Sequence, residues 1–299
     1  PFMMCTSCGW TPRCRNCDVT LTYHKSTDKL HCHYCGFRNA VMHVCPACGS
    51  EHITGKTFGT QKIEEEAQRI FPDARVARMD ADSMKGRHAI ADLMDKLEKR
   101  HIDILAGTQM VVKGLDFEGV AVAGVINADN LLSFPDFRVN ERAFQLLEQV
   151  AGRAGRADGQ GLVLIQVCKT DHPVLKWVKD HDIASFYRYE IKHREQFFYP
   201  PFSRLIRIIF RHADEGKTAQ AAQMMADALQ TVPGIGVQGP GAAIVPRVRN
   251  QYIYEIWIKC PRDTRIGDSV KTFLKEQRRH ISSQRGNTNV QIIFDVDPA

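Results

Sequence analysis

Residues 5–48 read CTSCGWTPRCRNCDVTLTYHKSTDKLHCHYCGFRNAVMHVCPAC and contain eight of the ten cysteines in the chain. The eight form four Cys-x-x-Cys pairs, namely Cys5/Cys8, Cys14/Cys17, Cys32/Cys35 and Cys45/Cys48. Two residues between the thiolates allow both sulfurs to bind one ion at about 2.3 Å, so four pairs supply the ligands of two tetrahedral zinc ions. Each site would have four protein ligands and no open position for water, which predicts structural and not hydrolytic zinc.

A disulfide-rich secreted domain is the main alternative interpretation of so many cysteines. The rest of the chain contains only Cys168 and Cys260, and the repeated Cys-x-x-Cys spacing favours metal binding. Five histidines in the same region exceed the ligands that two ions need. We expect them to be surface groups or neighbours of the ligands: His24, His31, His33, His43 and His52.

Four Cys-x-x-Cys pairs can combine in three ways. Residues 19–24, Val-Thr-Leu-Thr-Tyr-His, alternate like a strand of a zinc-ribbon hairpin between the two inner pairs. Closing that hairpin brings the outer pairs together. We therefore expect nested pairing, while sequential and cross-braced pairings remain open. In the nested arrangement Cys5, Cys8, Cys45 and Cys48 bind one ion, and Cys14, Cys17, Cys32 and Cys35 bind the other.

The length of 299 residues favours about two domains of ~150 residues, and the content of 43% hydrophobic and 25% charged residues is that of a globular protein. There is no membrane-length apolar run and no visible secretory leader, so we expect a cytoplasmic protein. A chain that opens at Pro1, with metal-type cysteines from Cys5, is expected to be a segment of a longer one. The net charge of +6 is concentrated toward the two ends, which suits a polyanion partner or a chance asymmetry equally well.

From residue 53 onwards, short apolar strands alternate with helices. Repeated βα units predict an α/β fold, a parallel sheet covered by helices on both faces, whose ligands bind beyond the carboxyl ends of the strands. Thr60 is the expected cap of the first helix. The expected strands are 53–58, 75–79, 102–106, 120–127 and 162–167, and the expected helices are 60–71, 84–100 and 140–151.

Two motifs lie beside such strand ends. The stretch GTQMVVKGLDF (107–117) directly follows a strand, and QVAGRAGR (149–156) ends a helix that precedes a strand. Arg153 and Arg156 project from one compact turn and carry planar, permanently charged groups that suit phosphate oxygens. Two solvated arginines at the end of a helix are the plain alternative.

The motifs at 107–117 and 149–156 resemble motifs V and VI of superfamily 2 helicases. Together with the cysteine-rich region and with residues 129–142, they make essentially the whole chain resemble the C-terminal part of the bacterial primosomal replication-restart helicases, the PriA family. One departure is Leu115, where motif V of the family commonly carries His. The resemblance implies a double zinc module at 1–52, a second RecA-like helicase lobe at 53–170 and a C-terminal α+β domain at 171–299.

The resemblance also implies roles for individual residues. Arg156 would be the arginine finger that reaches the γ-phosphate of ATP, with Arg153 beside it and Gln149 supporting the nucleotide. Gly114 and Asp116 would line the cleft in which ATP and Mg²⁺ are shared with a first lobe. The residues of this lobe that would bind the tracked DNA strand are Thr108, Gln109 and Lys113.

After about residue 169 the pattern changes. A helix is expected at 172–192, and the stretch FFYPPF (197–202) then resembles the YPPF signature that opens the last domain of the family. The expected order β-α-β-β-α-β predicts a ferredoxin-like α+β fold. Its strands are expected at 205–210, 252–259 and 290–296, with a loop and strand between the helices, and its helices at 218–229 and 269–279.

The loop expected at 239–249 of this domain joins cations to nearby aromatic residues. Arg247 and Arg249, with Tyr252 and Tyr254, would bind single-stranded or branched DNA through phosphate contacts and base stacking. A basic surface loop beside ordinary strand tyrosines fits the sequence equally well.

The function implied by the resemblance is that of an ATP-dependent 3′–5′ DNA helicase, acting as a monomer, that recognises stalled forks and starts primosome reassembly. Expected partners are forked and single-stranded DNA, primosome proteins of the PriB and DnaT type, and the acidic tail of the single-stranded DNA-binding protein. Candidates for binding that tail are Arg265, Lys271 and Arg279. Two rivals are a non-catalytic zinc-ribbon DNA-binding or assembly module, and another superfamily 2 translocase that acts on RNA or protein–DNA complexes.

The phosphate-binding half of an ATP site is missing from the sequence. A phosphate-binding loop has the form Gly-x4-Gly-Lys-Ser/Thr. The Gly-Lys-Thr tripeptides at 55–57 and 216–218 both lack the first glycine at that spacing, and no acidic box follows an apolar strand.

We therefore expect the chain alone to show no measurable ATP hydrolysis, with or without forked DNA, because it carries only the arginine side of a nucleotide site. A phosphate-release assay measures this, and mixing or fusing the chain with a first helicase lobe is the positive control. Robust DNA-stimulated turnover by the chain alone would contradict the expectation.

Overall fold

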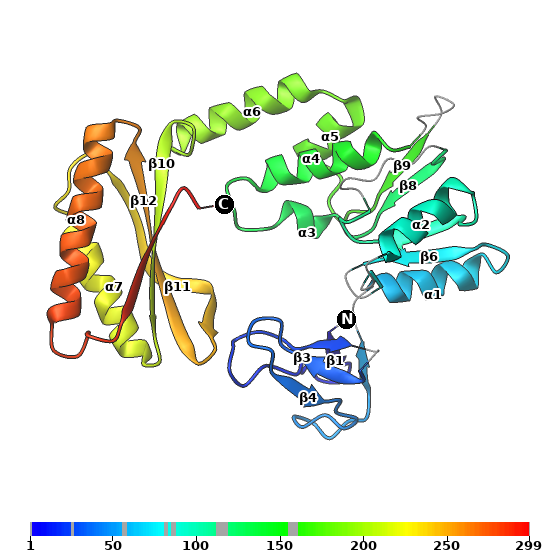
Figure 1. Ribbon diagram of the computed structural model, residues 1–299, viewed down its shortest axis with the longest axis horizontal. Helices are drawn as coiled ribbons and strands as arrows, with labels where there is room; N and C mark the ends of the chain where they lie inside the picture. The colour runs from blue at the N-terminus through cyan, green and yellow to red at the C-terminus, as the bar shows by residue number, and fades with distance from the viewer. Residues whose placement is uncertain are drawn as a thin grey trace. The chain divides into compact units, whose positions relative to one another are not determined.

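The computed structural model describes residues 2–24, 27–55, 59–80, 83–84, 88–111, 119–154 and 161–298. They belong to two compact units (Figure 1). One unit combines Pro1–Thr57 with Arg194–Ala299, and the other is Phe58–His193. Among the residues that the structure describes, no helix is both long enough and apolar enough to cross a membrane.

The N-terminal part of the first unit consists of very short strands between cysteine loops. The expected inner hairpin is confirmed: β2 (Thr22–His24) pairs antiparallel with β3 (Lys29–His31), which also pairs with β4 (Arg38–Ala40). The strand expected at 53–58 does not open the parallel sheet. It is observed as β5 (Ile53–Gly55) and pairs antiparallel with β1 (Met3–Cys5), because the outer cysteine loops bring the two ends of the module together.

The second unit contains parallel strand pairs, as the βα pattern predicts. Strands β6 (Val76–Met79) and β7 (Ile104–Gly107) form one pair, and β8 (Val122–Val125) and β9 (Leu162–Ile165) form the other. Within the described residues these are two separate two-stranded sheets. The helices are α1 (Thr60–Ile70), α2 (Ala89–Glu98), α3 (Asp129–Leu132), α4 (Val139–Ala151), α5 (Pro173–Asp180) and α6 (Ile183–Gln196).

Helices α4, α5 and α6 share an apolar core in this unit. Phe144 of α4 stacks on Phe186 of α6 with ring centroids 4.1 Å apart. The helix expected over 172–192 is in fact α5 and α6, because His181 adopts a left-handed conformation with φ of 50° and ends α5. Trp177 packs edge-on against Phe186, so the break folds the two helices onto one core.

The C-terminal part of the first unit has the predicted β-α-β-β-α-β order. Its four strands lie in the antiparallel order β11-β12-β10-β13, which is the ferredoxin-like arrangement. Both helices cover one face of this sheet (Figure 1), where Phe210, Met225, Ile256 and Leu274 are fully or almost fully buried. The elements are β10 (Ser203–His212), α7 (Glu215–Leu229), β11 (Gly236–Val248), β12 (Gln251–Pro261), α8 (Thr264–Ser283) and β13 (Gln291–Val296).

Gly107 is required where β7 ends beside β6. A Cβ atom at this position would lie 2.5 Å from the carbonyl oxygen of Met79 and 2.2 Å from Cγ2 of Val111. The Met79 oxygen belongs to the backbone of the neighbouring strand and cannot turn away. Gly124 of β8 is a matched position in the same unit, because a Cβ there would meet no atom within 4 Å.

We expect Gly107→Ala to lower the free energy of unfolding by about 1–3 kcal/mol, the usual cost of forcing an extra carbon into a packed site. Gly124→Ala should leave it unchanged or raise it by up to about 1 kcal/mol, because alanine restricts the unfolded chain. Urea unfolding followed by circular dichroism measures both. Equal effects of the two substitutions would contradict the close packing at Gly107.

Candidate functional site

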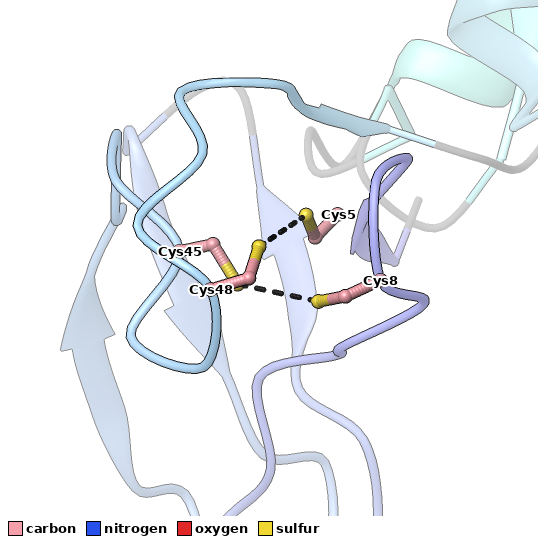
Figure 2. A group of neighbouring side chains, drawn as sticks. All are labelled: Cys5, Cys8, Cys45 and Cys48. Atoms are coloured by element: carbon pink, nitrogen blue, oxygen red, sulfur yellow. Dashed lines mark hydrogen bonds between the residues drawn. The ribbon is translucent and has the colours of Figure 1, made fainter.

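The outer cysteine group joins the two ends of the N-terminal module. Figure 2 shows Cys5 and Cys8 from one loop facing Cys45 and Cys48 from another. The Sγ atoms of Cys5 and Cys48 are 3.7 Å apart, as are those of Cys8 and Cys45. All four Sγ atoms lie within 4.8 Å of one another. Cys5 and Cys45 are buried, whereas Cys8 and Cys48 are exposed.

The inner group forms at the base of the β2–β3 hairpin. Its members are Cys14, Cys17, Cys32 and Cys35, whose Sγ atoms also lie within 4.8 Å of one another. The Sγ atoms of Cys14 and Cys35 are 3.6 Å apart. Nested pairing, which the hairpin predicts, is therefore the pairing that the structure contains.

Each Cys-x-x-Cys loop closes in the same way. The backbone N–H of its first cysteine donates to a carbonyl five residues later, for example Cys5 to Trp10 at 2.8 Å and Cys32 to Phe37 at 2.8 Å. In three of the four loops, a glycine after the second cysteine has φ near +75°, a conformation that side chains disfavour. The exception is the loop Cys14–Cys17, which is followed by Asp18.

The sulfur positions fit zinc. Four ligands at about 2.3 Å in a tetrahedron place neighbouring sulfurs about 3.8 Å apart, which the observed separations of 3.6–3.7 Å match closely. Backbone N–H groups point at the inner sulfurs, from Asn16 to Cys14 at 3.4 Å and from Phe37 to Cys35 at 3.4 Å. Such donors stabilise thiolates, which are the form of cysteine that binds metal.

The thiols within each group compete for protons. Burial raises the pKa of Cys5, but the backbone N–H groups of Cys8 and Ser7 and the neighbouring thiols lower it to about 6. In the same group, the N–H of Trp10 lowers the pKa of Cys8, whereas hydrogen bonds with Cys48 and Cys45 and burial raise it to about 12. Without metal, one thiol ionises while its neighbours keep their protons. A bound divalent cation supplies the positive charge that allows all four thiols to ionise.

The Cys14–Cys17 loop of the inner group also contacts the tip of the β11–β12 hairpin, which lies more than 200 residues later in the chain. Its backbone donates from Asp18 to the carbonyl of Arg247 at 2.9 Å and accepts at Asn16 from the N–H of Asn250 at 2.8 Å. The N–H of Arg249 donates to Sγ of Cys17 at 3.3 Å. The Cys14–Cys17 loop, which has no following glycine, therefore contacts the C-terminal domain through its backbone and through one of its thiols.

These contacts engage both arginines that the sequence assigns to DNA. The guanidinium of Arg247 pairs with the carboxylate of Asp18 at 3.0 Å, and Nε of Arg249 donates to the carbonyl of Tyr34 at 3.2 Å. The hydroxyl of Tyr254 donates to Glu215 at 3.4 Å. Arg247 and Arg249 thus have a structural role that sequence analysis missed, and their contact with DNA stays a prediction.

The helicase-like motifs are only partly within the described residues. Thr108 and Gln109 are exposed immediately after β7. Gln149 is exposed on the last turn of α4, and Arg153 is half-buried in the turn that follows. Lys113, Gly114, Leu115, Asp116 and Arg156 lie outside the described residues.

Sequence analysis also missed a buried carboxylate at the end of β6. Asp80 is 8% exposed and accepts hydrogen bonds from the hydroxyl of Thr60 and the N–H of Ser83. Burial raises the pKa of Asp80, but these donors, with nearby Arg78, hold it below its ordinary value. Thr60 does not cap α1, because its side chain is directed to Asp80 and Gly59 occupies the capping position. The available signal was the position of Asp80 directly after the strand expected at 75–79.

Comparison with known proteins gives two family matches. Residues 195–299 match the family described as the primosomal protein N C-terminal domain, and residues 14–39 match the PriA DNA helicase Cys-rich region domain. The second match covers the inner cysteine group, and the first covers the ferredoxin-like sheet.

Similar curated proteins cover nearly the whole chain. It is 40% identical over 299 residues to the replication restart protein PriA of Bacillus subtilis. The matched stretch covers 99% of this chain and 37% of that protein. It is 39% identical over 297 residues to PriA of Treponema pallidum, which covers 98% of the chain and 44% of that protein. The chain therefore spans less than half the length of these curated relatives.

We expect atomic absorption to find two zinc ions per chain, and one ion in each of the variants Cys8→Ser and Cys17→Ser, because each substitution removes a ligand from a different group. Cys168→Ser is the control and should keep both ions, since Cys168 is exposed and belongs to neither group. A protein without zinc and with oxidised cysteines would contradict both metal sites.

Proposed function

Because the chain belongs to the PriA family of replication restart proteins, to whose C-terminal portion it corresponds, we propose that it is part of an ATP-dependent 3′–5′ DNA helicase. The complete protein binds stalled forks and initiates primosome reassembly. The observation that carries this proposal is the 40% identity to a replication restart protein over a stretch that includes the cysteine loops, both helicase-like motifs and the C-terminal domain.

In this proposal the second unit is the second RecA-like lobe of the motor. Its parallel strand pairs suit such a lobe. Arg153 and Arg156 stabilise the charge that develops on the γ-phosphate, while Gln149, Gly114 and Asp116 line the nucleotide cleft. ATP and Mg²⁺ are shared with a first lobe, which supplies the phosphate-binding loop. The position of Gln149 and Arg153 at the C-terminal end of α4 supports a shared role for them.

The two cysteine groups hold zinc in a structural role. A tetrahedral ion with four thiolates has no free position for a substrate or an activated water. The ions keep the short loops of the module rigid, and the inner one does so where the module meets the β11–β12 hairpin. The module then acts as a firm contact for DNA and for the proteins that reload the replicative helicase.

Basic and polar side chains bind DNA and the protein partners in this proposal. Thr108, Gln109 and Lys113 contact the tracked strand, and the exposed faces of Arg247 and Arg249 contact the fork. The acidic tail of the single-stranded DNA-binding protein suits the basic helix α8, where the side chain of Arg265 is 94% exposed. Further candidates for that tail are Lys271 and Arg279, and other partners are primosome proteins of the PriB and DnaT type. The protein acts in the cytoplasm as a monomer.

The test uses the full-length protein with Arg156→Ala. DNA-stimulated ATP hydrolysis and fork unwinding should fall by roughly three orders of magnitude or more, as for other arginine fingers. Binding to forked DNA should change little, because the role proposed for Arg156 is with the nucleotide and not with DNA. Arg69→Ala is the matched control: it removes an arginine of the same unit whose side chain is 71% exposed and pairs only locally with Glu66.

Unchanged ATP hydrolysis in Arg156→Ala would overturn the assignment of the finger. A wild-type full-length protein that binds forks without hydrolysing ATP would instead favour the non-catalytic assembly module. Stimulation by RNA in place of forked DNA would favour a different translocase of superfamily 2.

A further inference from the structure

Three histidines gather on one face of the β2–β3 hairpin. In the antiparallel register Thr22 lies opposite His31, and His24 lies opposite Lys29. His24 and His31 are therefore diagonal neighbours on the same face of the hairpin. His33 lies two residues beyond His31, on the other side of Cys32 in the sequence.

The ring of His24 contacts both other rings. Its centroid lies 4.5 Å from that of His31 and 5.1 Å from that of His33. Its Nε2 atom lies 3.3 Å from Nε2 of His33. His24 and His31 are half-buried and His33 is exposed, so the three residues lie at the surface of the module.

The distance between these nitrogens suits a shared metal ion. Two nitrogens bound to one tetrahedral ion at about 2.0–2.1 Å lie about 3.3–3.4 Å apart. A hydrogen bond from an N–H group to an oxygen usually places the heavy atoms closer, at about 2.9–3.0 Å. Neutral imidazole suits zinc, copper and nickel, whereas calcium and magnesium prefer oxygen. The pair thus has both the spacing and the chemistry of a transition-metal chelate.

His31 is placed to supply a third ligand. Its Nε2 bonds Oγ1 of Thr27 at 3.3 Å, and rotation of the ring about Cβ–Cγ exchanges this long hydrogen bond for a bond to the ion. We propose that His24, His31 and His33 form a third metal site, separate from the two cysteine groups, which binds a divalent transition-metal ion such as Zn²⁺ with water in the remaining position.

This site binds its ion more weakly than the cysteine groups do. No thiolate contributes negative charge, and two cations share the face: Lys29 lies opposite His24, and Arg38 lies opposite His31. Their repulsion of an added cation is reduced by water, because both residues are exposed. The third ion therefore exchanges with solution while the two thiolate-bound ions stay in place.

The test starts from protein that already holds two zinc ions per chain. Zn²⁺ is added to it in a calorimeter at pH 7.5, above the ordinary pKa of an imidazole group. Wild type should bind one further equivalent. His24→Gln/His33→Gln should lose that event over the range in which wild type saturates, and equilibrium dialysis should then count two ions instead of three. The control His43→Gln/His52→Gln removes two other histidines of the same module and should behave like wild type.

A second measurement needs no variant. In NMR spectra of the two-zinc protein, added Zn²⁺ should shift the ring signals of His24, His31 and His33 and leave those of His43 and His52 in place. Absence of a third equivalent, or equal shifts of all five rings, would overturn the proposal. Because every sample begins with both cysteine groups loaded, either outcome leaves the structural zinc sites and the helicase function unaffected.

Discussion

The convergence of eight thiols into two tetrahedral groups is the constraint on which the N-terminal module depends. Its strands are three residues long, and its apolar cluster is built around Leu21 and Leu30 packed against cysteines. So small a core does not offset the conformational entropy of ordering more than fifty residues. The metal–thiolate bonds supply the missing free energy, and the module is folded to the extent that its cysteines are ionised and ligated.

In the first unit, the tip of one hairpin of the C-terminal domain depends on the cysteine module, whereas the core of that domain does not. The ferredoxin-like sheet has its own core, with Phe210, Met225 and Ile256 fully buried under α7 and α8. The tip of the β11–β12 hairpin is different, because its arginines and Asn250 bond to the inner cysteine loop. Metal at the inner group thus fixes a loop of a domain that contains no metal ligand, which links the two family matches physically.

Sequence patterns predicted the features that depend on residues close together in the chain. The nested cysteine pairing followed from the alternation of residues 19–24, and the β-α-β-β-α-β order followed from strand and helix periodicity. The errors involved partners distant in sequence. Thr60 matched a helix cap but bonds Asp80, and β5 joins β1. The pairing of Arg247 with Asp18 was missed, while the contact of Arg247 with DNA stays a prediction. Neither periodicity nor composition contains such pairings. The roles predicted for Arg153, Gln149 and Thr108 remain predictions, because a nucleotide or a DNA strand is needed to bring them together.

The bond between the inner cysteine loop and the hairpin tip joins residues that are 229–234 positions apart. A ribosome that adds about 5–20 residues per second needs roughly 10–50 s to synthesise that interval. During this time the newly made module has no hairpin to cover Cys17 and no N–H from Arg249 at its sulfur. An ion bound during this interval is therefore held by the module alone, and the N–H of Arg249 reaches the sulfur of Cys17 only after the C-terminal domain has been made.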